Sequence, residues 1–146
     1  MRRICTVLVL VALFGVTEAR AQEKIKIAVP EIALSGADKS LGKILTEVLI
    51  TEASNIKKVS VIGASDIAAM LGFEKQKALL GCSDDVSCMA EIGGALAVDF
   101  LMISDLGMLG SMYVLNLKLI DSGKSEVVKR IYKTVTGTPD KLIEVV

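Results

Sequence analysis

The first 21 residues constrain the fold most, because they define which part of the chain folds and in which compartment. The chain opens with two arginines, residues 4–16 form an apolar run, and residues 19–21 read Ala-Arg-Ala. These are the features of a secretory signal peptide. The run is shorter than the roughly 20 apolar residues that span a bilayer. We predict cleavage between Ala21 and Gln22, with an uncleaved N-terminal anchor as the alternative.

Charge and composition exclude several classes of function for the mature chain, residues 22–146. Three of the 17 basic and one of the 17 acidic residues leave with the signal, so 14 basic and 16 acidic residues remain. No basic run exceeds two residues, whereas nucleic-acid-binding proteins concentrate positive charge on one face. Histidine is absent, which excludes Ser-His-Asp and Cys-His catalysis and the zinc sites that contain histidine. We therefore expect no nucleic-acid partner, and no transmembrane segment after signal cleavage.

Hydrophobic patterning divides the mature chain into strands and helices in the order β-α-β-α-α-β-β-β-α. Alternating apolar or clustered β-branched residues predict strands at residues 24–32, 57–62, 100–106, 112–120 and 127–135. Apolar residues at helical spacing and capping signals predict helices at residues 41–53, 65–71, 74–80 and 86–96, and another from residue 138. Residues 34–37, 107–110 and 121–124 are predicted loops or turns, and Gly123 is expected to adopt a positive φ.

The order of these elements predicts an α/β fold with a single mixed five-stranded sheet covered by helices. Two early strands joined through a helix favour parallel pairing with a right-handed crossover. Two tight turns make the last three strands an antiparallel meander. Numbered along the chain, the predicted strand order is 2-1-3-4-5, with residues 57–62 and 127–135 at the edges. Lys57-Lys58 and Lys129-Arg130 are the charges expected on edges that must not pair with another sheet.

The C-terminal segment is short for a helix. Thr138 can cap it, Pro139 suits its first position and Asp140 its first turn, but few residues follow. A helix of this length is marginal in water by itself, so it must dock on the sheet or continue. Because the chain ends on apolar residues without a cap, we favour the second possibility, in which the domain of residues 22–146 is truncated at its C-terminus.

Two cysteines remain in the mature chain, Cys82 and Cys88, because Cys5 lies in the signal. Gly81 and the polar residues that follow place Cys82 before a helix and Cys88 in its first turns, which makes a disulfide feasible. An even number of cysteines in an oxidising compartment also favours one. We interpret the pair as a structural staple, since the spacing is not the Cys-x-x-Cys of redox centres. No cysteine follows the signal for lipid attachment.

The tightest acidic group is Asp84, Asp85 and Glu91. As a metal site it would suit a hard cation bound by oxygen ligands. The simpler interpretation is that the two aspartates stabilise the start of a helix electrostatically. Gly93-Gly94 lies inside the same helix, and we interpret it as a site of close packing rather than of ligand approach. No catalytic residue, metal ligand or cofactor site is predicted from these patterns.

Several stretches resemble a known family of bacterial envelope domains. They are residues 26–30 (Lys-Ile-Ala-Val-Pro), residues 65–67, residues 81–88 with both cysteines, residues 91–104 (Glu-Ile-Gly-Gly-Ala-Leu-Ala-Val-Asp-Phe-Leu-Met-Ile-Ser), and the tail segments 119–121 and 129–130. Together they resemble the N-terminal domain of TolB and the core of CsgG, most closely the cysteine-bearing secreted versions of myxobacteria and their relatives. The resemblance covers nearly all of residues 24–146, without the lipidated cysteine of CsgG or the propeller of TolB. It implies a noncatalytic module that binds protein partners.

The sequence thus predicts a noncatalytic binding or assembly module of the Gram-negative cell envelope, periplasmic or secreted, with an envelope protein as its partner. Two alternatives remain open. One is a small-molecule-sensing domain, and the other is a metal-dependent hydrolase that uses Asp84, Asp85 and Glu91.

Overall fold

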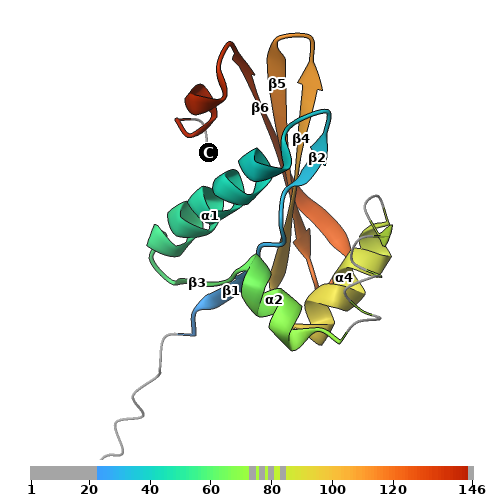
Figure 1. Cartoon of the computed structure of the whole chain (residues 1–146). Helices are drawn as coiled ribbons and strands as arrows, with labels where there is room; N and C mark the ends of the chain where they lie inside the picture. Colours follow the sequence, from blue (N-terminus) through green and yellow to red (C-terminus); the bar gives the residue numbers. More distant parts are fainter. Residues whose placement is uncertain (1–22, 73–74, 76–77, 79–80, 83–84, 145–146) are drawn as a thin grey trace, which may run out of the picture.

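A mixed β-sheet forms the centre of the computed structural model, which describes residues 23–72, 75, 78, 81–82 and 85–144 (Figure 1). Its strand order is β3-β1-β4-β5-β6, and β2 pairs with β4 beyond the end of β1. The strands are β1 (Ile25–Ala28), β2 (Ala33–Ser35), β3 (Val59–Ile62), β4 (Phe100–Leu109), β5 (Met112–Asp121) and β6 (Glu126–Thr136). The predicted cleavage site between Ala21 and Gln22 lies outside the described residues.

The predicted sheet order is confirmed. Strand β1 pairs in parallel with β3 and β4, and β4, β5 and β6 form the antiparallel meander. The described residues form six strands rather than five, because residues 33–35 form β2 where a loop was predicted. Pro30 has no N–H for a ladder, and the chain leaves the sheet after β1. The N–H of Ile32 donates instead to Thr46 Oγ1 at 3.0 Å, and pairing with β4 resumes at Ala33.

Helices cover both faces of the sheet. Helix α1 (Lys39–Asn55) lies on one face, where buried Leu45 and Leu49 join the side chains of the strands. Helices α2 (Ala64–Met70) and α4 (Val86–Ala95) lie on the other face, where Ile67 and Met89 pack on Leu101 and its neighbours (Figure 1). The three helices match the predicted segments 41–53, 65–71 and 86–96 to within a few residues. Most of the predicted segment 74–80 lies outside the described residues.

Helix α1 begins at a well-formed N-cap. Asp38 has extended backbone angles, and its carboxylate accepts a hydrogen bond from the backbone N–H of Ser40 at 2.7 Å. The Ser40 hydroxyl donates to the same oxygen. These two hydrogen bonds hold the pKa of Asp38 below its ordinary value, and the bond from the hydroxyl has the larger effect. An ionised cap at this position satisfies donors that a helix start otherwise leaves unpaired.

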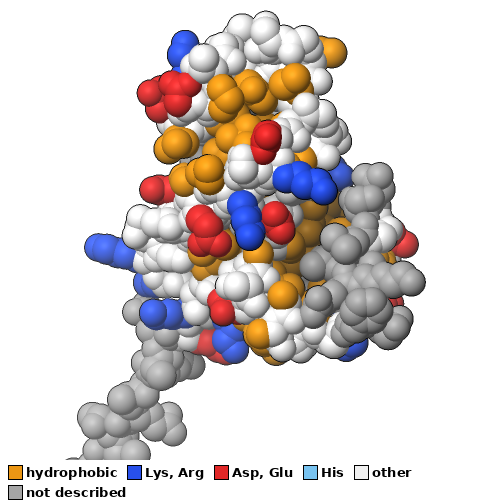
Figure 2. Space-filling model, in the orientation of Figure 1, with side chains coloured by type: hydrophobic (Ala, Val, Ile, Leu, Met, Phe, Trp, Pro, Cys, Tyr) orange, Lys and Arg blue, Asp and Glu red, His pale blue; other side chains and the backbone are white. Residues whose placement is uncertain are grey.

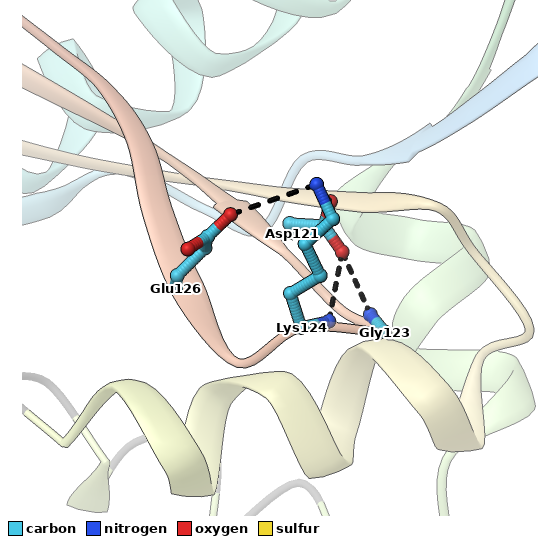
Figure 3. Close-up of polar contacts among 4 residues, drawn as sticks. All are labelled: Asp121, Gly123, Lys124 and Glu126. Atoms are coloured by element: carbon cyan, nitrogen blue, oxygen red, sulfur yellow. Dashed lines mark hydrogen bonds and ion pairs between the residues drawn. The ribbon is translucent and has the colours of Figure 1, made fainter.

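The turn between β5 and β6 is organised by Asp121, as Figure 3 shows. One of its carboxylate oxygens accepts hydrogen bonds from the backbone N–H groups of Gly123, at 3.0 Å, and Lys124, at 2.9 Å. The Lys124 ammonium lies 3.7 Å from Asp121 and 3.7 Å from Glu126. The prediction of a positive φ at Gly123 is wrong: the left-handed residue of this turn is Ser125, with a φ of 54°.

The segment after β6 is a single 3-10 turn, η1 (Pro139–Leu142), rather than the start of an α-helix. Thr138 occupies the cap position, although its side chain makes no capping hydrogen bond. The side chain of Leu142 is fully buried against Leu115 and Val135, on the face that α1 covers. The segment thus docks on the sheet through Leu142, and truncation of the domain at its C-terminus stays a prediction.

Candidate functional site

The acidic group predicted from the sequence does not come together as a ligand set in the described residues. Asp85 caps α4, because its carboxylate accepts hydrogen bonds from the backbone N–H groups of Ser87 and Cys88 at 2.9 and 3.2 Å. Glu91 is exposed in the middle of α4, and Asp84 lies outside the described residues. Across the part of the chain that the structure describes, no three acidic or cysteine side chains are grouped as a metal site would require.

The two cysteines of the described residues are joined at the start of α4. Cys82 and Cys88 form a disulfide, with their Cα atoms 5.7 Å apart. Cys82 is buried in the cluster that also contains Met89 and Leu71, so the bond lies against the core on the α2–α4 side. This placement fits a staple that fixes the start of α4 beside α2.

Replacing both cysteines with serine should lower the free energy of unfolding by about 2 kcal/mol, because a seven-residue loop is no longer closed in the unfolded chain. Urea unfolding of the purified mature protein measures this change. Free-thiol titration of the native parent protein should detect neither cysteine. Two freely reactive thiols, or unfolding curves that coincide, would contradict the staple interpretation.

One part of the sheet lies beyond helices α2 and α4. Five polar or charged side chains project there from β4, β5 and β6, and we call this surface the open face; they are Asp105, Asn116, Lys118, Arg130 and Tyr132. The register aligns them in two rows: Asp105, Asn116 and Tyr132 lie across the three strands, and Lys118 lies opposite Arg130. The Asn116 amide donates to the Asp105 carboxylate at 2.8 Å, while Tyr132 is 71% exposed.

The open face contains a cavity of about 390 Å³, lined by its five residues together with Leu117 and Ile131. A second, much smaller hollow adjoins it where Lys118 and Arg130 approach Asp85 and Met89 at the start of α4. Arg130 is exposed at this surface, and its guanidinium can attract a ligand or partner that carries negative charge.

Sequence reasoning found part of this site. It predicted that Lys129 and Arg130 lie on an edge strand. It missed Asp105 and Tyr132, because the contact of Asp105 with Asn116 depends on the register of β4 on β5. The signal available in the sequence was Asp105 itself, a carboxylate in the largely apolar strand β4.

Apolar side chains are also exposed near the outer ends of β4 and β5 and after η1. Leu109 is 70% exposed, Met108 is 48% exposed, and Ile143 beyond η1 is 51% exposed. Figure 2 shows hydrophobic side chains gathered over this upper part of the molecule. No helix in the described part of the chain is long and apolar enough to cross a membrane.

Comparison with known proteins shows a shared fold. No family model and no curated protein matches the chain. Among solved structures, the LpoB C-terminal domain from Escherichia coli superposes with a TM-score of 0.58 at 14% identity, covering 79% of this chain and 84% of that domain. Lipoprotein GNA1162 from Neisseria meningitidis superposes with a TM-score of 0.56 at 12% identity, covering 79% of this chain and 82% of that one. Identities this low show the fold alone.

The resemblance to TolB has a weaker counterpart among the structures. TolB from Acinetobacter baumannii matches with a TM-score of 0.48 at 10% identity, over 82% of this chain and 24% of TolB. We base no argument on a match this loose. The fold is that of the LpoB domain and of lipoprotein GNA1162, while the likeness to CsgG and to the myxobacterial versions stays a prediction.

Proposed function

We propose that this chain is an exported, noncatalytic binding or assembly module of the Gram-negative cell envelope. The observation that carries the proposal is the open face, a set of polar and charged side chains displayed on strands. The exposed Arg130 can attract an acidic partner, while Asp105 accepts a hydrogen bond from Asn116 in a structural pair. The secretion signal predicted from the sequence and the fold shared with a lipoprotein of Neisseria meningitidis support an envelope location.

The metal-dependent hydrolase is the less favoured hypothesis. It needs Asp85 as a ligand, yet one oxygen of this carboxylate already accepts hydrogen bonds from the backbone N–H groups of Ser87 and Cys88. Withdrawing the carboxylate to bind a metal would uncap the helix, at a cost of about 1 kcal/mol.

A small-molecule-sensing domain remains a second candidate, because the cavity of the open face has the volume of a ligand pocket. The cavity lies on the surface of the strands, and one wall is formed by the ring of Tyr132, which is itself 71% exposed. Pockets for small molecules usually enclose most of the ligand's surface. For this reason we place the protein-binding role first.

Expression of the whole chain, signal included, in a Gram-negative bacterium tests the proposed function. We expect the periplasmic fraction to contain a protein whose mass corresponds to a first residue of Gln22. Chemical crosslinking in intact cells, followed by mass spectrometry, should join it to an envelope protein. The variant Glu91→Ala should behave as the parent. An intact Met1 form confined to the cytoplasm, or a crosslink pattern limited to cytoplasmic proteins, would overturn the proposal.

A further inference from the structure

Strand β6 is an unusually exposed edge of the sheet. It is 11 residues long, or about 36 Å at the rise of an extended strand, and among the described strands it pairs with β5 on one side. A sheet strand normally buries one of its faces. Here residues 128–134 are exposed on both faces, and burial returns at Val135.

The exposed part of β6 carries a concentration of positive charge. Lys129 and Lys133 project from one face of the strand with Ile131 between them, and Arg130 projects from the other face beside Lys118. Among the described residues no carboxylate forms an ion pair with Lys129, Arg130 or Lys133. Lys124, in the turn at the far end of the strand, forms ion pairs with Asp121 and Glu126 (Figure 3).

We propose that the free edge of β6 binds an extended, acidic segment of a protein partner by strand addition. This inference rests on the proposed function and names the surface and the kind of partner. The outward backbone groups of β6 would supply the hydrogen-bond ladder. Acidic residues four positions apart would face Lys129 and Lys133, with an apolar residue between them over Ile131. On the other face, the cavity beside Arg130 and Tyr132 receives an alternate side chain.

Charge also excludes the simplest rival occupant, a second copy of this chain. Antiparallel pairing of two β6 edges brings three cations of one strand beside three of the other, and like charges on paired strands are destabilising. The same cations therefore reject a second copy of this edge and select an acidic strand. Lys129, Arg130 and Lys133 would thus both protect this edge from pairing with another copy and favour an acidic partner.

A synthetic peptide tests the inference directly on the protein recovered from the periplasm. The probe is nine residues long, with two glutamates four positions apart, a valine midway between them and threonines elsewhere. Fluorescence anisotropy measures its dissociation constant. The charge-reversed variant Lys129→Glu/Lys133→Glu should bind at least tenfold more weakly. The matched control Lys39→Glu/Lys43→Glu reverses two exposed lysines, also four positions apart, on α1 and should bind as the parent does.

Two further arms separate strand addition from simple charge attraction. A peptide with lysines in place of the glutamates should bind the Lys129→Glu/Lys133→Glu variant and not the parent, which also shows that the variant is folded. In one further probe peptide the amides at odd positions are N-methylated, and in another those at even positions. Each peptide therefore lacks the N–H donors along one edge of its extended strand. At least one of them should fail to bind, because a ladder needs those donors.

Several outcomes would overturn the inference. They are equal weakening in the α1 and β6 variants, undiminished binding of both N-methylated peptides, no binding of the parent peptide, or dimerisation through β6 in analytical ultracentrifugation. Crosslinking in cells distinguishes this failure from failure of the proposed function. An envelope partner retained by the Lys129→Glu/Lys133→Glu variant refutes the β6 site alone, whereas absence of any envelope partner from the parent refutes the binding module itself.

Discussion

Gly93→Ala is expected to lower the free energy of unfolding by about 3 kcal/mol, near the upper end of the usual cost of overpacking. A Cβ at Gly93 would lie 2.9 Å from Ser122 Cβ and closer still to Ser122 Oγ, which belongs to the β5–β6 turn. The Ser122 hydroxyl is buried without a hydrogen-bond partner in the described structure. Rotation about χ1 can move the Oγ away but not the Cβ, whose position is set by a backbone that is held by the hydrogen bond from the Ser122 N–H to the Asp99 carbonyl at 3.0 Å.

Gly94→Ala is the matched control for this prediction. Gly94 also lies in α4, but a Cβ built on it meets nothing within 4 Å. Alanine at an open helical position should raise the free energy of unfolding by about 0.5–1 kcal/mol. Thermal and urea unfolding of the two variants provide the measurement. If the two alanine variants have the same stability, Gly93 does not make the close contact with Ser122 that the structure shows.

The helix around these glycines shows how far sequence reasoning could go. The pair Gly93-Gly94 predicted close packing, but the sequence could not say which glycine makes the contact or with what. That depends on the β5–β6 turn, whose left-handed residue is Ser125 rather than Gly123. The C-terminal end of α4 gives a similar case. Just after the helix, Ala97 has a φ of 52°. The N–H of Ala97 donates to the Gly94 carbonyl, and the N–H of Val98 donates to the Gly93 carbonyl. Glycine is the residue usually found there, so the sequence carried no signal.

The sheet was predictable because its signals are long and local. The alternation of apolar residues in β5 extends over its whole length, and strict pairing with β4 follows from a short turn. Strand β2 was missed because three residues carry too little periodicity. Its place depends on the long-range contact of Ile32 with Thr46 on α1 and on the close approach of Gly42 to Leu34.

The candidate site divides in the same way. The edge position of β6 and its cations followed from the order of strands, which local patterns determine. The open face depends on register across three strands, so Asp105 and Tyr132 could not be assigned to it in advance. The acidic group of Asp84, Asp85 and Glu91 was adjacent in sequence, but in the described residues Asp85 points to backbone donors at the start of α4.

Leu142→Ala is expected to lower the free energy of unfolding by about 3 kcal/mol, as for a buried leucine whose site cannot collapse fully. Its side chain is fully buried with Leu115 and Val135, yet the turn that presents it has little backbone support. The Lys141 N–H donates to the Thr138 carbonyl at 3.3 Å, and that of Ile143 to Asp140 at 3.2 Å. A segment held in this way depends on one side chain rather than on its own hydrogen bonds.

The neighbouring residue supplies the control, because Ile143 is 51% exposed and Ile143→Ala should change stability by less than about 0.5 kcal/mol. Native-state hydrogen exchange should show that η1 opens more readily than α1, since such a turn can detach locally while the sheet stays folded. In the Leu142→Ala variant, β6 near Val135 should also exchange faster, because its cover is lost. Equal effects of the two substitutions would mean that η1 does not dock, and the sheet face beside α1 would then be complete without it.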